Sequence, residues 1–355
     1  MVNISHNMIK NSAIITTSSI KTGLGIYAWR LYNMHLLEHL RYYEIDPHNT
    51  DYDAKYVIQR KYKILNRWFF NKKLSYYFGS VYKKDIEKYS VVHLGDQSIF
   101  YLSKYNKNSI GTVHDLFGIE EKNKYYNWNL KNLQYIEKLK AVVVLTDSIK
   151  KKVMEMYSNV NIVRIHQWTE NNFTLRDKIE SRKKLGLDLN KIILLNVSID
   201  IPRKNIDILP KIMNSLDENY ILLRIGNTDR IINEFQRKSQ IKVVSKVPKE
   251  LYPLYFNAAD FLLFPSLDEG FGAPIIEAIK SGLPVIASNR EYAKEVLQGK
   301  GILADPLNYN EWVEAINKNM DNLPAISKNA LSLYDYYSEG RAKKEYEKLY
   351  HSLGY

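Results

Sequence analysis

The chain has 355 residues, which is too long for one hydrophobic core and predicts two domains. Its composition, 45% apolar and 25% charged, excludes a disordered or fibrous protein, and the lack of cysteine excludes disulfides and thiolate metal sites. The formal net charge is +12, and residues 1–200 hold 31 of the 51 Lys and Arg residues against 19 of the 39 Asp and Glu residues. A basic first part suits nucleic acid, anionic lipid headgroups or a phosphorylated substrate, but it also suits a surface that only keeps the protein in solution.

The N-terminal stretch lacks the apolar segment of a secretory signal. The longest apolar runs, such as Ala141–Leu145 and Phe261–Phe264, have the length of a strand and not of a membrane span. We therefore expect a cytoplasmic protein, either free or peripheral on the inner face of the membrane.

In the first part of the chain, short β-branched runs alternate with segments of helical periodicity. A helix is expected over residues 26–37, directly after the first strand and a loop with Ser and Gly. Continuous apolar strands between helices predict a parallel sheet that is covered on both faces. The expected strands are residues 12–17, 91–94, 110–113, 141–145 and 161–165.

The alternation repeats after a polar connection at residues 166–190, in which a basic helix over 175–185 ends at Gly186. The expected strands there are residues 191–197, 220–225, 241–247, 261–264 and 284–287, with helices over 249–257 and 273–280.

These patterns predict an α/β protein with two Rossmann-like, doubly wound parallel-sheet domains, at residues 1–170 and 171–335. The tail at 336–355 reads as a helix that either covers the second sheet or crosses back onto the first domain.

A basic and aromatic stretch occupies residues 55–89 and includes Trp68, Lys72 and Lys73. This composition is typical of an interfacial membrane helix. It also suits a nucleic-acid surface, where aromatic rings stack on bases. A third interpretation is an ordinary helix whose aromatic side chains face the core while its lysines face water.

The segment with the most chemical content is PSLDEGFGAPIIEA, residues 265–278. Gly270 and Gly272 let the backbone approach a ligand closely, and Pro274 is well placed at the start of a helix. The free N–H groups of a helix N-terminus at the carboxyl end of a parallel strand form an anion site. Glu269 and Glu277 can accept hydrogen bonds from sugar or ribose hydroxyls beside it.

The sequence EGFGAPIIE resembles the E-x7-E signature of the retaining family-four glycosyltransferases, which have the GT-B fold with two domains facing a central cleft. The flanking sequences YPLYFNAADFLLFPS and AIKSGLPVIASN continue that pattern. Upstream, NVSIDIPRKN resembles the loop that supplies phosphate-binding cations, KTGLGIY resembles the N-terminal glycine loop, and TVHDLF resembles the strand end that carries a histidine. The matches span most of the chain in the expected order.

On the second domain, the resemblance implies that Glu277 holds the ribose hydroxyls of the nucleotide and that Glu269 holds the transferred sugar. It also implies donor contacts from the backbone that follows Glu269, which is that of Gly270, Phe271, Gly272 and Ala273.

For the other motifs, the resemblance implies that Arg203 and Lys204 neutralise the donor diphosphate. His114 would contact the sugar or the acceptor from the first domain. Gly23 and Gly25 would let a loop of that domain close over the phosphates.

Breaking a glycosyl–phosphate bond leaves negative charge on the diphosphate, which fixed cations and a helix N-terminus stabilise. Family members retain the anomeric configuration without a metal, so we expect a nucleoside diphosphate sugar as donor, no metal and no other cofactor. One position departs from the family: Ile199 follows Ser198 where an Arg is usual. Either Arg203 beside Lys204 compensates, or this basic pair only marks the entry to a helix.

Three weaker signals have ordinary interpretations. The Asp51–Asp53 pattern resembles the metal-binding Asp-x-Asp of another glycosyltransferase fold, but it follows no expected strand. His35 and His39 have the spacing of one helix face, yet no third metal ligand accompanies them, which favours a surface or core role. His166 ends a strand at the domain junction.

The predicted function is transfer of a hexose, of the mannose or glucose type or an N-acetylhexosamine, from a nucleoside diphosphate sugar to a saccharide or lipid-linked acceptor. The basic first part motivates a lipid-carried acceptor at an anionic membrane surface, with no nucleic-acid partner. The alternatives are a non-catalytic nucleotide-sugar-binding protein, a sugar-nucleotide epimerase of the same fold, and a nucleic-acid-binding protein.

Overall fold

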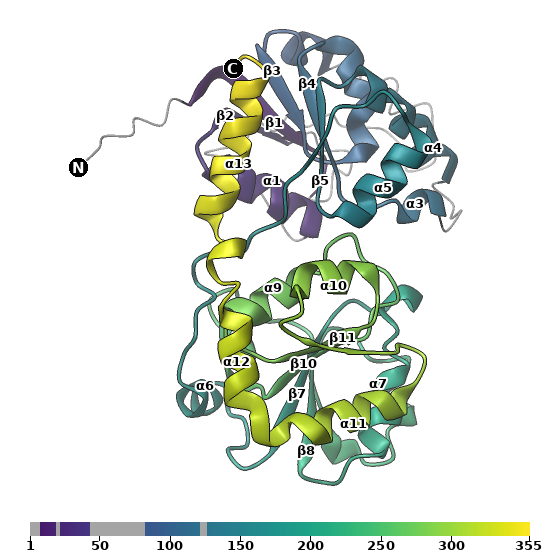
Figure 1. The fold of residues 1–355 in the computed structure, drawn as a ribbon, viewed down its shortest axis with the longest axis vertical. Helices are drawn as coiled ribbons and strands as arrows, with labels where there is room; N and C mark the ends of the chain where they lie inside the picture. Colours follow the sequence, from purple (N-terminus) through teal and green to yellow (C-terminus); the bar gives the residue numbers. More distant parts are fainter. Residues whose placement is uncertain (1–7, 19–21, 43–81, 121–125) are drawn as a thin grey trace, which may run out of the picture. The chain divides into compact units, whose positions relative to one another are not determined.

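A computed structural model describes residues 8–18, 22–42, 82–120 and 126–355 (Figure 1). The Asp51–Asp53 pattern and residues 55–81 of the basic and aromatic stretch lie outside the described residues. The chain forms two compact units, Met1–His166 with Ala342–Tyr355, and Gln167–Arg341. No helix in the described ranges is long and apolar enough to cross a membrane.

The sheet of the first unit is parallel, with the strand order β2-β1-β3-β4-β5-β6. Its central strands are buried along their whole length, as the continuous apolar runs predict. The strands are β1 (Ile9–Thr16), β2 (Leu37–Tyr42), β3 (Val91–Leu94), β4 (Ser109–Val113), β5 (Ala141–Val144) and β6 (Ile162–Arg164).

Helices of the first unit pack around this sheet (Figure 1). They are α1 (Gly23–Asn33), α3 (Phe117–Glu120), α4 (Tyr126–Leu133), α5 (Asp147–Met156) and most of α13 (Glu339–Ser352), with 3-10 helices η2 (Gln97–Tyr105) and η3 (Gln134–Lys138). Helix α13 packs on the sheet through the buried residues Tyr346 and Tyr350. The Tyr346 hydroxyl hydrogen-bonds that of Tyr27, and the Tyr350 hydroxyl lies 2.8 Å from Nδ1 of His93.

The helix expected over residues 26–37 was predicted too long at its C-terminal end. Helix α1 ends at Asn33, because His35 adopts a left-handed conformation with a φ of 56° that a helix cannot continue. Leu37 then begins β2, which pairs in parallel with β1. The apolar residues of this segment therefore belong to two elements.

The second unit also has a parallel sheet, with the strand order β12-β11-β10-β7-β8-β9. The order reverses between β7 and β10, which is the switch point where open α/β sheets bind ligands. The strands are β7 (Ile192–Val197), β8 (Tyr220–Ile225), β9 (Ile241–Val244), β10 (Phe261–Phe264), β11 (Val285–Ser288) and β12 (Ile302–Ala304), of which β12 was not predicted.

Alternate residues of these strands face opposite layers of helices. Leu194 and Leu222 share one core with Trp312 of α11 and with apolar residues of α7. The helices are α6 (Lys178–Leu185), α7 (Ile208–Asn214), α8 (Tyr252–Ala258), α9 (Ala273–Lys280), α10 (Glu291–Leu297), α11 (Tyr309–Asn319) and α12 (Leu323–Leu331). Short 3-10 helices are η4 (Pro202–Lys204), η5 (Ile232–Glu234), η6 (Lys238–Gln240), η7 (Met320–Asn322) and η8 (Asp335–Tyr337).

The basic helix of the polar connection is confirmed as α6. Its N-terminus is capped by Asp177, whose carboxylate accepts from the backbone N–H of Glu180 at 2.7 Å. Its C-terminus ends at Gly186, which has a φ of 59°.

Candidate functional site

Two loops meet at the switch point of the second sheet. The loop after β7 contains η4, and the loop after β10 leads into α9. The backbone N–H of Leu267 donates to the carbonyl oxygen of Arg203 at 2.7 Å and so joins the two loops. The loop after β10 is also held by Tyr292, whose hydroxyl donates to the carbonyl oxygen of Ser266 at 2.9 Å.

Glu269 lies against both cations that were assigned to the diphosphate. Arg203 donates from Nη1 to Oε2 of Glu269 at 3.2 Å, and Lys204 donates from Nζ to Oε1. The Glu269 side chain is 8% exposed, and those of Lys204 and Arg203 are 14% and 23% exposed. The structure thus brings three predicted site residues together, in a cluster whose net charge is positive.

The start of α9 has the geometry of an anion site. Gly272 adopts a φ of 93° at the N-cap position, where no side chain caps the helix, and Pro274 lies in the first turn. This φ favours glycine, and a Cβ on Gly272 would also crowd Ile275, whose Cδ1 would lie 3.2 Å away. The helix therefore begins directly after the loop of Gly270 and Phe271, with its N–H groups at the carboxyl end of β10.

The loop after β10 is packed from behind by an aromatic pair. Phe271 is 3% exposed and contacts Tyr337 edge to face, with ring centroids 6.1 Å apart. The aromatic side chain of the EGFG sequence is therefore part of the core, and a donor contact at this position would come from its backbone. Ala273 is the first residue of α9.

Glu277 lies one turn into α9 and is 6% exposed. Its Oε2 accepts a hydrogen bond from the hydroxyl of Tyr252 at 3.0 Å. The ring of Tyr252 is fixed by edge-to-face contacts with Phe173 and Phe256, at centroid distances of 5.8 Å and 5.3 Å. The sequence analysis quoted the YPLYFNAAD segment but did not identify Tyr252, because its pairing with Glu277 is visible only once α8 packs on α9.

The first unit presents His114 at the end of β4. The side chain is 5% exposed, and its Nε2 donates to the carbonyl oxygen of Gly95 at 2.8 Å. Burial lowers the pKa of His114 to about 4, so the ring is neutral at physiological pH. Since Nε2 carries the hydrogen, Nδ1 is a hydrogen-bond acceptor.

The orientation of His114 is fixed from two further directions. The ring of Tyr27 lies edge to face against it at 4.6 Å, and the backbone N–H of His114 donates to Oε1 of Gln97 at 3.3 Å. An acceptor nitrogen held in this way suits a hydroxyl donor, such as a sugar hydroxyl, and does not suit a phosphate.

Gly23 and Gly25 lie in the first turn of α1 and not in an open loop. The N-cap residue Thr22 accepts from the backbone N–H of Gly25 at 3.2 Å. A Cβ on Gly23 would meet no atom within 4 Å, so the fold itself does not require glycine at this position.

The two histidines with helical spacing do not share a helix face, because His35 lies in the turn after α1 and His39 lies on β2. In the described part of the chain, no group of three or more His, Asp or Glu side chains is arranged to hold a metal ion. His166 follows β6, and its Nε2 lies 2.6 Å from Nη1 of Arg164.

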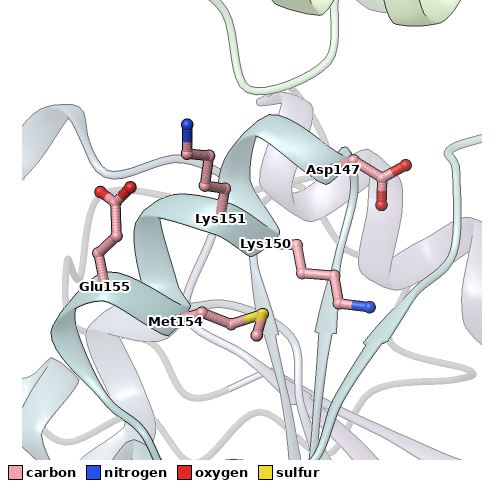
Figure 2. Close-up of a pocket in the computed structure, with 5 residues that line it drawn as sticks. All are labelled: Asp147, Lys150, Lys151, Met154 and Glu155. Carbon is pink, nitrogen blue, oxygen red and sulfur yellow. The ribbon is translucent and has the colours of Figure 1, made fainter.

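The surface of α5 carries an open, shallow hollow of about 460 Å³ (Figure 2). It is lined by Asp147, Lys150, Lys151, Met154 and Glu155, and the Met154 side chain is 56% exposed. Two lysines and two carboxylates surround the exposed methionine, so this surface of the first unit is amphipathic, and one of the carboxylates, Asp147, pairs with Arg164 at 3.1 Å.

Comparisons with known proteins indicate a family for part of the chain and a fold for the whole of it. Residues 177–332 match the family described as glycosyl transferases group 1. The O-antigen chain mannosyltransferase RfbU of Salmonella typhimurium is 28% identical over 245 residues, which are 65% of this chain and 66% of that protein. The match thus spans slightly less than two thirds of the relative's own length.

Solved structures share the whole fold. Sucrose-phosphate synthase from Thermosynechococcus elongatus has a TM-score of 0.81 at 18% identity, covering 96% of this chain and 98% of that one. HepE of Anabaena, in complex with UDP and glucose, has a TM-score of 0.76 at 14% identity, covering 96% and 99%. Residues 177–332 thus match the glycosyl transferases group 1, and the two parallel sheets give the chain the GT-B fold of these solved structures.

Proposed function

We propose that the protein transfers a hexosyl group, of the mannose or glucose type or an N-acetylhexosamine, from a nucleoside diphosphate sugar to a saccharide or lipid-linked acceptor. Transfer proceeds with retention of the anomeric configuration and needs no metal ion. The observation that carries the proposal is the cluster of Arg203, Lys204 and Glu269 beside the N-terminus of α9.

The cluster provides the charges that the reaction needs. As the glycosyl–phosphate bond breaks, the diphosphate gains negative charge, and two fixed cations with a helix N-terminus stabilise it. Glu269 pairs with both cations and so neutralises one of their two positive charges, and it becomes an acceptor for sugar hydroxyls when a diphosphate binds the cations in its place. Glu277, oriented by Tyr252, accepts from the ribose hydroxyls.

The comparisons support this class of donor and acceptor. The HepE structure contains UDP and glucose, and RfbU is named for mannosyl transfer to the O-antigen chain. Both names fit a hexosyl donor activated by a nucleoside diphosphate, and the second fits a growing saccharide as acceptor.

Calorimetric titration with UDP, GDP and ADP in the presence of EDTA tests the donor site. We expect one of the three to bind, and we expect Glu277→Ala to lose that binding. Glu291→Ala is the matched control, because Glu291 is an exposed carboxylate of the same unit that contacts Lys294. If none of the three binds at millimolar concentration, the donor-site assignment is wrong. NMR of the anomeric configuration of the product then tests retention.

The lipid-linked acceptor has support from α5. Lys150 and Lys151 lie beside the exposed Met154, and of the two carboxylates on this surface Asp147 is paired with Arg164, so the lysines are the charges offered to anionic headgroups. We expect the protein to bind liposomes that contain an anionic lipid, and Lys150→Glu/Lys151→Glu to weaken that binding. Lys183→Glu/Lys184→Glu on α6 is the control with the same change of charge. Failure of the wild-type protein to bind such liposomes contradicts the membrane proposal, whereas unchanged binding by the α5 variant contradicts only the α5 surface.

A second candidate is a nucleotide-sugar-binding protein without transferase activity. The observation that favours it is Ile199, which is 62% exposed at the position where the family usually has an arginine. This candidate predicts diphosphate binding without turnover for every acceptor, and an epimerase would convert the nucleotide sugar with no acceptor present. Incubation of the donor alone, followed by chromatography of the nucleotide sugars, separates these outcomes.

A further inference from the structure

Arg224 is a buried cation close to the switch point of the second sheet. It lies on β8, has no exposed surface, and donates only to uncharged groups. Nη1 donates to Oδ1 of Asn196 and, at 2.9 Å, to Oγ of Ser198. Nη2 donates to the carbonyl oxygens of Ser198 at 2.8 Å and Asn227 at 3.1 Å, and Nε is buried without a hydrogen-bond partner.

This charge is not neutralised by a direct ion pair. Among the residues that the structure describes, no carboxylate lies within ion-pair distance of Arg224, and Asp200, which attracts it from farther away, pairs with Arg230 at 2.9 Å. Burial lowers the pKa of Arg224 to about 10, so the guanidinium remains charged at neutral pH. An unpaired buried charge is costly to maintain, which calls for a compensating role.

The contacts of Arg224 cross three neighbouring strands near their carboxyl ends. Asn196, the acceptor for Arg224 on β7, donates from Nδ2 to the carbonyl oxygen of Leu263 on β10 at 2.8 Å. The order β10-β7-β8 places this row at the edge from which the two donor-site loops emerge. The guanidinium is thus linked to both sides of the switch point.

Arg224 also fixes the start of the loop that carries the site cations. It holds both the hydroxyl and the carbonyl of Ser198. Gly226 packs against the same carbonyl, since a Cβ at that position would lie 2.1 Å from it. Ser198 directly precedes Ile199, where the family resemblance leads us to expect an arginine. This chain therefore has an exposed apolar side chain at position 199 and a buried cation on the adjacent strand.

We propose that Arg224 is a positioning residue for the donor diphosphate. Through Ser198, Arg224 holds the loop that carries Arg203 and Lys204, and it adds a fixed positive charge behind that loop. The charge partly replaces the one that Ile199 lacks. The inference rests on the proposed function. Arg203, Lys204 and Glu269 together carry one net positive charge, so a further cation in a poorly screened interior strengthens attraction for a diphosphate.

The test compares binding of a nucleoside diphosphate with binding of its parent nucleoside. The probe is whichever of UDP, GDP and ADP the wild-type protein binds most tightly, and the nucleoside lacks the phosphates on which Arg224 acts. We expect Arg224→Met to weaken diphosphate binding by at least about 10-fold and to leave nucleoside binding within about 2-fold. Ile199→Arg in the Arg224→Met background should restore part of the lost affinity, because it returns a cation to the loop.

Two further variants separate charge from shape. Arg224→Lys retains the charge but not the planar fork, so it should give an intermediate loss. Asn196→Asp places a carboxylate against the guanidinium and should weaken diphosphate binding while Arg224 is still present. It also removes the Nδ2 donor to the carbonyl oxygen of Leu263, so Asn196→Ser, which loses the same donor without adding charge, is its control. Circular dichroism and thermal unfolding establish that each variant is folded, and Asn196→Asp decides the question if Arg224→Met does not fold.

Equal loss of nucleoside and diphosphate binding would indicate a purely structural role and overturn the inference. Folded Arg224→Met that binds the diphosphate as tightly as the wild type would also overturn it. If Arg224→Met does not fold, the same result in Asn196→Asp would do so. Failure of the wild-type protein to bind any of the three diphosphates overturns the proposed function and this inference with it. Unchanged diphosphate binding in the variants overturns this inference alone.

Discussion

The hydroxyl of Tyr252 donates to Oε2 of Glu277 over 3.0 Å, so a residue of α8 orients a carboxylate of α9. Both side chains lie in the second unit, and the tyrosine ring is packed between Phe173 and Phe256. A carboxylate held in one orientation binds a vicinal pair of hydroxyls with less loss of side-chain freedom than a mobile one.

We expect Tyr252→Phe to weaken nucleoside diphosphate binding by about 5-fold to 10-fold, because the hydrogen bond to Glu277 is lost while the ring packing remains. The measurement is calorimetric titration beside thermal unfolding. Tyr255→Phe, on the same helix, serves as a control for loss of a tyrosine hydroxyl. Unchanged binding in Tyr252→Phe would show that the hydroxyl does not orient a nucleotide ligand.

Glu269→Gln should separate binding from transfer. The substitution frees Arg203 and Lys204 from their ion pairs with Glu269, so binding of the nucleoside diphosphate alone should be unchanged or a few-fold tighter. Transfer should fall by about 100-fold, because the carboxylate that holds the sugar is lost. Steady-state kinetics and calorimetry of the same preparation check both effects, and parallel losses in binding and transfer would argue against the assigned role.

Acid should destabilise the first unit through its buried histidines. Burial lowers the pKa of His93 to about 3 and that of His114 to about 4, below the ordinary value of 6.5. As the pH falls below about 6.5, the unfolded chain takes up protons that the folded chain does not. The stabilisation is therefore present above pH 6.5 and is lost as the pH falls toward 4.

Denaturant unfolding at several pH values between 7.5 and 4.5 measures this effect. We expect His93→Gln to lower stability at pH 7.5 and to flatten its pH dependence by about 1 kcal/mol per pH unit relative to the wild type. His351→Gln, which changes an exposed histidine of α13, is the matched control variant. An identical slope in His93→Gln would mean that His93 is protonated in the folded protein.

Two glycines should respond differently to alanine. Gly226 has a φ of 134°, and its added Cβ would lie 2.1 Å from the carbonyl oxygen of Ser198. Gly226→Ala should therefore cost about 2 kcal/mol or more of unfolding free energy. Gly23→Ala should leave stability nearly unchanged, because no atom lies within 4 Å of the new Cβ. A loss of transfer in stable Gly23→Ala would support close approach of a ligand to this turn.

The sequence predicted the elements whose signals are local. The EGFGAP segment combines glycines, a helix-opening proline and a preceding apolar run, and α9 begins at Ala273 as these signals require. The alternation of apolar strands and helices likewise predicted both parallel sheets. The resemblance pointed to the family whose model matches residues 177–332, because its motifs are short and contiguous.

Other features depend on contacts between distant residues. The left-handed turn at His35 ends α1 and starts β2, and a histidine carries no strong signal for that conformation. The partnership of Arg224 with Asn196 joins residues on adjacent strands, and that of Tyr252 with Glu277 joins two packed helices. Periodicity indicates that such residues are buried but does not say which polar groups they meet.

The placement of α13 has a consequence for the order of folding during synthesis. Residues 167–341 form a continuous unit, whereas the first unit is completed by Ala342–Tyr355. Tyr346 and Tyr350 provide the hydroxyl groups that pair with Tyr27 and His93, and the ribosome makes them only after the whole second unit. The second unit can therefore fold while the first still lacks α13, and the first unit exposes the apolar surface that α13 covers until Tyr346 and Tyr350 have been made.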